Sequence, residues 1–327
     1  MSKIQYIFRL LPFACCLFFF SSCGNNASTP TQGNLKIYID ESYRQLMQAE
    51  EEAFEVLYAS SDIEPVYKPE GDIISDFMND TCRIIILARD LSQKEKDFFK
   101  SKNSFPTSTK IAVDALAFIT HKENPISELT YNELKGVFTG KINSWKYLYS
   151  ALKHDGLQDS TITIVFDNEK SCNVRMIKDK LLGGKEFPKN CFALKSNPVR
   201  QNGRTPSSSG EVVEYVSKNK NALGIIGVNW ISDGDDTLTR SFLSKVNVLS
   251  VSSEENPGDF YQPYQASIYE KVYPFSRDVF FINNEGRTGL GTGFAAFVAG
   301  EKGQLIILKA GMVPATQPIR MVEITIN

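Results

Sequence analysis

The sequence contains few of the residues on which most catalytic and metal sites depend. Its 327 residues include 2 histidines, 2 tryptophans and 6 cysteines, and no two cysteines have C-x-x-C spacing. His121 and His154 lie far apart in the chain, which argues against a histidine-rich metal site. Neither histidine stands in a recognisable setting for a serine–histidine hydrolase, so that activity is only a distant alternative. We therefore expect no metal, no cofactor and no catalytic residues.

A strong charge of either sign is also missing. The 36 basic and 38 acidic residues leave a net charge of −2, which gives no bulk affinity for nucleic acid or anionic lipid. With 42% hydrophobic and 23% charged residues, the composition is that of an ordinary globular protein. The length predicts two domains.

The longest apolar run lies at the N-terminus. Two basic residues precede the uncharged stretch 10–20, which is short for a bilayer span and typical of a secretory signal. The sequence FSSC that ends at Cys23 resembles a bacterial lipoprotein processing site, with Phe20 where Leu is usual. This resemblance implies removal of residues 1–22 and attachment of lipid to Cys23. A simple N-terminal anchor, or cleavage at another small residue, is the alternative. Residues 23–34 would form a flexible tether.

The cysteine content argues against a disulfide scaffold. Two of the six cysteines would leave with the signal, and Cys23 would carry the lipid. Cys82, Cys172 and Cys191 remain, an odd number that allows at most one bridge. Cys172 with Cys191 is the only plausible pair, and the sequence does not decide whether they bond.

Beyond residue 34, strand patterns alternate with helix patterns. The expected strands, all short apolar or β-branched runs, are 35–39, 64–68, 83–87, 111–119, 161–166, 222–226, 246–251 and 278–282. Four helix starts have the spacing of a capping box, namely Ser42 with Gln45, Ser92 with Glu95, Thr130 with Glu133, and Ser208 with Glu211. The alternation predicts an α/β fold with mostly parallel sheets covered by helices on both faces, and ligands outside the carboxyl ends of the strands.

One strand–loop–helix unit is a candidate anion site. The strand 161–166 is followed by a polar loop, and Ser171 is placed to cap a helix that Gly183 ends. Backbone N–H groups at such a helix start point to the edge of the sheet, where they can bind an anion. Most helices of this kind cap themselves and bind nothing, so the unit alone does not decide the function.

The segment 114–145 carries the most specific pattern of the chain. It contains an Asp114-Ala turn, Asn-Pro at 124–125, Leu-Thr at 129–130 and the element FTGKINSW at 138–145. In this it resembles the phosphate-binding, PstS-like family of periplasmic solute-binding proteins. Weaker matches at 223–227, 273–275 and 303–314 extend the resemblance over residues 35–320.

The resemblance implies a two-lobed periplasmic binding protein of type II with two hinge crossings. Lobe one would comprise residues 35–113 with 270–327, and lobe two residues 114–269. A small anion, phosphate in the family, would be bound between the lobes and passed to an ABC transporter permease without covalent chemistry. We therefore expect a monomeric, non-enzymatic solute-binding lipoprotein that faces the periplasm and has no nucleic-acid partner.

The resemblance also implies which residues contact the ligand. The family uses Gly, Ser and Thr at helix N-termini, and an Arg four residues before Ser-Gly-Thr. Here Ser171-Cys172-Asn173 stands in place of Ser-Gly-Thr, and Asp167 stands in place of the Arg. Ser171 and Asn173 are the expected contacts, with Cys172 and Asp167 in the same site.

Two further contacts are expected from the other lobe. Ser42 belongs to the first ligand loop, and Arg89 matches a Ser-Arg-type segment in which Ala88 replaces the Ser. Several acidic residues accompany them, including Asp40, Glu41 and Asp72.

These acids leave the ligand open. A pair of charges ~4 Å apart is worth about 4 kcal/mol at an effective dielectric of ~20, whereas each helix-end interaction contributes about 0.3–1 kcal/mol. An unpaired Asp167 would therefore prevent tight phosphate binding, unless a basic residue neutralises it or it turns toward solvent. Otherwise a cation or a hydroxylated neutral molecule suits the site better. The alternative function is an envelope interaction or sensory protein that keeps the fold but has lost the anion site.

Overall fold

The computed structural model describes residues 28–149, 161–193, 208–232 and 237–316. Cys23, the expected signal and the first residues of the expected tether, to residue 27, lie outside the described residues, as does His154. Among the described helices, none combines the length and the apolar character that a membrane crossing needs.

Helices and strands alternate through most of the described chain. The strands are β1 (Gly33–Asp40), β2 (Ser61–Lys68), β3 (Ile84–Leu87), β4 (Thr107–His121), β5 (Glu128–Leu129), β6 (Thr163–Phe166), β7 (Cys191–Ala193), β8 (Ala222–Gly227), β9 (Val246–Val248), β10 (Ser250–Ser252), β11 (Phe260–Tyr261), β12 (Ser276–Asn283) and β13 (Val313–Pro314). The helices are α2 (Arg44–Leu57), α3 (Glu70–Met78), α4 (Gln93–Ser101), α5 (Tyr131–Phe138), α6 (Lys146–Tyr149), α7 (Cys172–Ile177), α8 (Ser208–Lys218), α9 (Thr237–Lys245), α10 (Gln265–Tyr269), α11 (Leu290–Ala299) and α12 (Glu301–Lys309), with short turns η2 (Glu41–Tyr43), η4 (Lys178–Leu182) and η5 (Val228–Trp230).

One long sheet runs through the described part of the molecule. Its strand order is β2-β1-β3-β12-β4-β8-β6-β7, and β9 and β13 also pair with β4. The outer pairs are parallel, as expected: β1 with β2 and β3, and β6 with β7 and β8. The pairs in the middle, formed by β4 and β12, are antiparallel. The α/β class and the mostly parallel sheet are therefore confirmed, with an antiparallel centre that the sequence pattern did not reveal.

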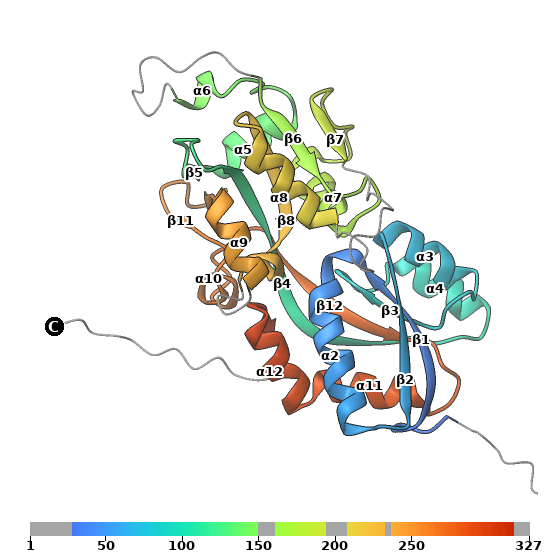
Figure 1. Cartoon of the computed structure of the whole chain (residues 1–327). Helices are drawn as coiled ribbons and strands as arrows, with labels where there is room; N and C mark the ends of the chain where they lie inside the picture. The colour runs from blue at the N-terminus through green and yellow to red at the C-terminus, as the bar shows by residue number, and fades with distance from the viewer. Residues whose placement is uncertain (1–27, 150–160, 194–207, 233–236, 317–327) are drawn as a thin grey trace, which may run out of the picture.

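The 15-residue strand β4 connects two lobes. Its first part, to Ala115, pairs with β12, and its second part, from Leu116, pairs with β8. Figure 1 shows β1, β2, β3 and α2 to α4 at one end of the molecule, β6, β7 and α5 at the other, and β4 running between them. The Leu116 amide donates to the Phe275 carbonyl (2.9 Å), so a second crossing lies beside β4 just before β12. The two-lobed fold with two hinge crossings is confirmed, whereas the residue boundaries of the lobes stay a prediction.

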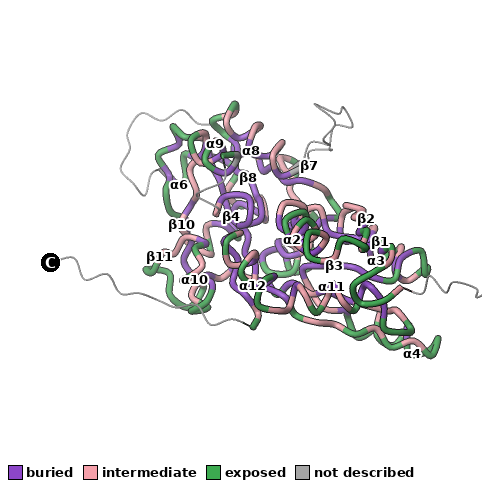
Figure 2. The backbone as a smooth tube through the Cα atoms, turned by 60° about the horizontal axis from the view of Figure 1, so that its bottom comes forward, coloured by how far each residue is buried: buried purple, intermediate pink, exposed green. Residues whose placement is uncertain are grey.

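Both faces of the sheet are buried in the first lobe. Along β3, Ile84 and Ile86 join a large apolar cluster with α2 and α11, while Ile85 and Leu87 join a smaller one with α3 and α4. Because successive strand residues point to opposite faces, a continuous run of isoleucine suits a strand that is covered twice. The large cluster continues into the second lobe through β4, β6 and β8, and Figure 2 shows β4 and β8 as mostly buried.

The helix starts at Ser92 and Thr130 are confirmed, since both residues form complete capping boxes with Glu95 and Glu133. The prediction for Ser42 was wrong. The Asp40 carboxylate accepts the Ser42 amide (2.9 Å), which forms the turn η2, and α2 begins only at Arg44.

Two other predictions need correction. The expected strand 246–251 is two strands, because β9 pairs with β4 whereas β10 pairs with β5 and β11. The expected helix 171–182 is α7 followed by the wider turn η4, which ends at Gly183 with a left-handed φ of 55°. Cys82, Cys172 and Cys191 are all free thiols, so the Cys172–Cys191 bridge is not formed.

Candidate functional site

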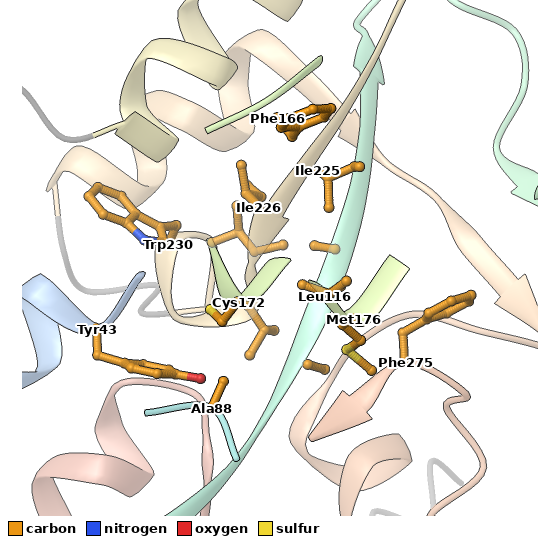
Figure 3. Close-up of a cluster of buried hydrophobic side chains, with 14 of the residues drawn as sticks. Tyr43, Ala88, Leu116, Phe166, Cys172, Met176, Ile225, Ile226, Trp230 and Phe275 are labelled. Carbon is orange, nitrogen blue, oxygen red and sulfur yellow. The ribbon is translucent and has the colours of Figure 1, made fainter. Parts of the chain in front are cut away.

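Loops from both lobes meet at one buried point beside the hinge. The loops that follow β1, β2 and β3 come from the first lobe, and those that follow β6 and β8 from the second. Each follows the carboxyl end of a parallel strand, where an α/β fold places its ligands. Figure 3 shows Cys172 between Tyr43 and Ala88 of the first lobe and Trp230 of the second.

Ser42 and Cys172 form the centre of this contact. Their Oγ and Sγ atoms lie 3.3 Å apart, and the Cys172 thiol also donates to Asp40 Oδ1 (3.2 Å). The Ser42 carbonyl accepts hydrogen bonds from Asn229 Nδ2 (2.7 Å) and Trp230 Nε1 (3.2 Å). Burial raises the pKa of the Cys172 thiol well above its usual value, so it stays a protonated donor. Ser42 and Cys172, two residues of the predicted site, therefore lie in one place and touch each other.

Asp167 lies buried in its own loop. Its Oδ1 accepts from the Asn168 amide (2.9 Å) and from Ser171 Oγ (2.7 Å), and its Oδ2 accepts from Asn173 Nδ2 (2.9 Å). The carboxyl neither faces solvent nor pairs with a basic residue of the described chain. Burial raises its pKa to about 6, against the lowering effect of the Ser171 and Asn168 hydrogen bonds. Ser171 also caps α7 as predicted, since its Oγ accepts the Val174 amide (3.2 Å).

Arg89 is engaged by acidic side chains. It donates to Glu95 through two nitrogens (2.8 and 2.9 Å) and to Glu70 Oε1 (3.3 Å). Glu70 is 3% exposed and also forms a close ion pair with Arg175 of α7. Arg175 donates further to the Ala88 carbonyl (3.2 Å). Glu70 thus ties together the two lobes, and the role of Arg89 as a ligand contact stays a prediction.

A second link between the lobes involves the loop after β2. The Gly71 amide donates to the Lys170 carbonyl (3.0 Å), and Lys170 Nζ pairs with Asp72 (2.7 Å). Lys170 therefore neutralises Asp72 rather than Asp167.

Behind these loops lies a buried ion pair at the hinge. Arg277 of β12 donates through Nε (3.0 Å) and Nη2 (2.7 Å) to Asp114 Oδ2 of β4, which also accepts from Tyr43 Oη (3.2 Å). Sequence reasoning placed Glu70 in the second ligand loop but did not single out Arg277 or Asn229. Arg277 follows the Tyr-Pro-Phe match at 273–275 by two residues, which is the only signal that pointed to its neighbourhood.

Several buried polar atoms near this pair have no hydrogen-bond partner among the described residues. They are Asp40 Oδ2, Asp114 Oδ1, Asn229 Oδ1 and Arg277 Nη1. Burial raises the pKa of Asp40, and the charge of Glu70 raises it further, against the effects of Ser42 and Arg277. Three acceptors and one donor therefore lie within the hinge region without a hydrogen-bond partner, which is costly for buried polar atoms.

The loop cluster is filled by its own side chains, since Asp40, Ser42, Cys172 and Asn173 are at most 1% exposed. Four surface hollows of the described residues lie elsewhere, and none is lined by these four residues. The largest of the four, about 690 Å³, lies between α5 and η4.

A metal site and a serine–histidine catalytic site find little support in the described part of the chain. It contains no group of three or more His, Cys, Asp and Glu side chains placed to hold a metal ion. His121 ends β4, and its Nδ1 accepts the Glu123 amide (3.0 Å) rather than a serine hydroxyl.

The sequence is similar to a known domain family and to known proteins. The model of the PBP superfamily domain matches residues 24–302. The phosphate-binding protein PstS of Borreliella burgdorferi is 28% identical over 241 residues, which cover 73% of this chain and 75% of the relative. The PstS protein of Pseudomonas aeruginosa is 22% identical and covers 86% of this chain and 83% of the relative.

Solved structures show the same fold. A phosphate ABC transporter substrate-binding protein with bound phosphate from Clostridium perfringens superimposes with a TM-score of 0.69 at 24% identity, covering 87% of this chain and 100% of that one. An ABC-type phosphate transport receptor from Vibrio cholerae gives a TM-score of 0.61 at 18% identity, with coverages of 86% and 100%.

Proposed function

The chain belongs to the PBP superfamily, and from this premise we propose that it is the extracytoplasmic solute-binding protein of an ABC-type transporter. The observation that carries the proposal is the meeting of loops from both lobes at Ser42 and Cys172, beside the two hinge crossings. The names of the relatives make phosphate the first ligand to test. The protein passes its solute to a membrane permease and carries out no covalent chemistry.

Ligand capture requires the lobes to separate. Ser42, Cys172 and Asn173 are at most 1% exposed, so a solute reaches them only after the loop contacts have opened. Rotation of one lobe about β4 and the neighbouring crossing at Phe275 would open them, which is the hinge motion usual for two-lobed binding proteins. The ligand contacts in this proposal remain Ser42, Arg89, Ser171 and Asn173.

We further propose that lipid on Cys23 anchors the mature protein at the membrane, facing the periplasm, as a monomer. The test is expression of the full chain and of Cys23→Ser, followed by labelling with a radioactive fatty acid. Wild type should be labelled and found with the membranes, whereas the variant should be unlabelled and soluble after cell fractionation. Equal labelling of the two proteins would contradict the anchor.

The ligand is tested by calorimetric titration of phosphate into the mature chain, residues 23–327 with Cys23→Ser, with sulfate as the competing anion. Saturable micromolar binding should be lost when Ser171 and Arg89 are both replaced by alanine. The matched control is Arg83→Ala, which removes an exposed arginine paired with Asp80 in the same lobe as Arg89. The absence of any heat at millimolar phosphate, from protein shown to be folded, would remove phosphate as the ligand.

One observation favours a second function. The carboxyl groups of Asp40 and Asp167 already accept the hydrogen bonds of the loop donors. An envelope interaction or sensory protein that has lost the anion site would have such a filled site. It would show no phosphate heat in the titration, while the lobes stay closed in solution.

A further inference from the structure

Two carboxyl groups take up the hydrogen-bond donors at the meeting point of the lobes. Asp40 accepts from the Ser42 amide and the Cys172 thiol. Asp167 accepts from the Asn168 amide, the Ser171 hydroxyl and the Asn173 side-chain amide. A backbone amide at a turn or helix start, together with hydroxyl and amide side chains, is the set of groups that holds a small oxyanion.

We propose that Asp40 and Asp167 are built-in competitors of the solute, which occupy the donors of the interlobe site until a small anion displaces them. The inference rests on the proposed function, because it concerns the same site and the same class of ligand. It adds a regulatory property of this chain, namely that capture of the anion depends on the charge of two of its own side chains.

The position of the two carboxyls makes them effective competitors. They approach the start of α7 from opposite lobes, because Asp40 ends β1 whereas Asp167 follows β6. The Cys172 sulfur lies 3.2 Å from Asp40 Oδ1 and 3.7 Å from Oδ1 of Asn173, whose amide group donates to Asp167. An anion that binds Ser42 and Asn173 must therefore displace these contacts and lie close to both carboxyl groups.

The charges around the two groups do not compensate for this repulsion. The titratable groups near Asp40 are Glu70, Cys172, Tyr43 and Arg277. Only Arg277 is a cation, and its charge is already paired with Asp114. Asp167 faces Asp40 and Glu41. No ion pair of either carboxyl with a lysine or arginine is formed within the described chain.

Protonation weakens the competition, because a neutral carboxyl no longer repels an anion. Burial raises the pKa of Asp167 to about 6, and it also raises the pKa of Asp40, whose Oδ2 has no partner among the described residues. Acidification below about pH 6 therefore converts Asp167 to the neutral form and favours the anion.

The experiment compares phosphate binding by the mature chain with that of Asp167→Asn and Asp40→Asn. Both variants keep one acceptor oxygen for the local turn, remove the charge and replace the second oxygen by an amide NH2 group. The control is Asp259→Asn, which removes an exposed carboxylate elsewhere. Calorimetry at about pH 8 and about pH 5 gives the ratio of wild-type to variant dissociation constants, in which the titration of phosphate itself cancels.

At about pH 8, Asp167→Asn and Asp40→Asn should each bind phosphate at least about tenfold more tightly than wild type, and the advantage of Asp167→Asn should shrink at about pH 5. Asp259→Asn should match wild type at both values. Circular dichroism shows whether each variant is folded. If one variant is unfolded, the affinity of the other tests the proposal.

Tight binding by wild type with no gain in the variants would overturn the competition and leave the proposed function intact. Binding by the variants alone would support the competition and show that it prevents capture in the natural chain. No binding by any of the four proteins at either pH would remove phosphate as the ligand and refute the competition for it.

Discussion

Replacement of Asp114 by asparagine should cost this protein a large part of its stability. Asp114 is fully buried, and Arg277 is bound to one of its oxygens through two nitrogens at 3.0 and 2.7 Å. The Arg277 side chain is 5% exposed, so loss of the carboxylate charge leaves its own charge buried without compensation. Removal of one partner of such a pair typically costs about 3–5 kcal/mol, out of a total stability of about 5–15 kcal/mol.

The same two strands provide a matched control. Lys110 of β4 pairs with Asp278 of β12 at 2.6 Å, but these side chains are 41% and 46% exposed. Water and salt screen such a pair, so Asp278→Asn should cost less than about 1 kcal/mol. The contrast isolates burial, because the strands and the type of substitution are the same.

The assay is urea unfolding followed by the fluorescence of Trp145 and Trp230. Both tryptophans are buried, so their fluorescence changes when the protein unfolds. The free energy of unfolding is measured at low salt and at about 0.5 M salt, where the screening length is only a few ångströms. Salt should reduce the small effect of Asp278→Asn and leave the effect of Asp114→Asn unchanged. Equal losses for the two variants would refute the reasoning that burial decides the strength of the hinge ion pair.

Three further predictions concern stability. The folded-state pKa of Asp167, about 6 against an ordinary 3.8, means that its stabilising contribution is present below about pH 3.8 and lost as the pH rises through about 6. Wild type should therefore lose up to about 3 kcal/mol relative to Asp167→Asn between about pH 4 and about pH 7, and parallel urea profiles would contradict this. Glu50 is fully buried with both oxygens unpartnered among the described residues, and burial raises its pKa to about 9. Folding at about pH 7 must therefore add a proton to Glu50, so Glu50→Gln should be more stable than wild type by about 1–3 kcal/mol at about pH 7 and equally stable at about pH 4. A gain at both pH values would contradict the interpretation that Glu50 is neutral in the folded protein. At Gly224, an added Cβ would lie 2.7 Å from Val216 Cγ2 and 2.8 Å from Ile119 Cγ1. Gly224→Ala should cost about 1–3 kcal/mol in urea unfolding, and a neutral effect would show that α8 shifts easily on β8.

Features that depend on neighbouring residues were predictable from the sequence. The helix starts at Ser92 and Thr130 need only a hydroxyl and a glutamate three residues later, and both form as expected. Ser171 caps α7 through its hydroxyl alone, which accepts the Val174 amide. The buried strands follow from apolar runs, and the resemblance to the PstS-like family indicates the two-lobed fold.

Features that depend on distant partners were not predictable. Arg277 and Asp114 are 163 residues apart, and no local pattern joins them. The expected strand 246–251 divides because β9 pairs with β4 whereas β10 pairs with β5, and these partners are known only from the folded sheets.

Asp167 lies between these cases. We expected it either to pair with a basic residue or to turn toward solvent. Instead it accepts hydrogen bonds from Asn168, Ser171 and Asn173, which belong to the same loop and the start of α7. Short polar side chains commonly bond backbone and side-chain groups a few residues away, so this arrangement was open to local reasoning.

The position of β12 has a consequence for how the protein must be made. β3 and β4 follow each other in the chain, yet β12 is inserted between them in the sheet. During synthesis, β3 and β4 are therefore complete long before β12, the strand that lies between them in the sheet. During that interval both carry unpaired edges rich in isoleucine and alanine, which invite pairing with other chains. Export of the chain in an unfolded form, with folding after residue 283 has crossed the membrane, would avoid this hazard, whereas a chain truncated before Ser276 should aggregate.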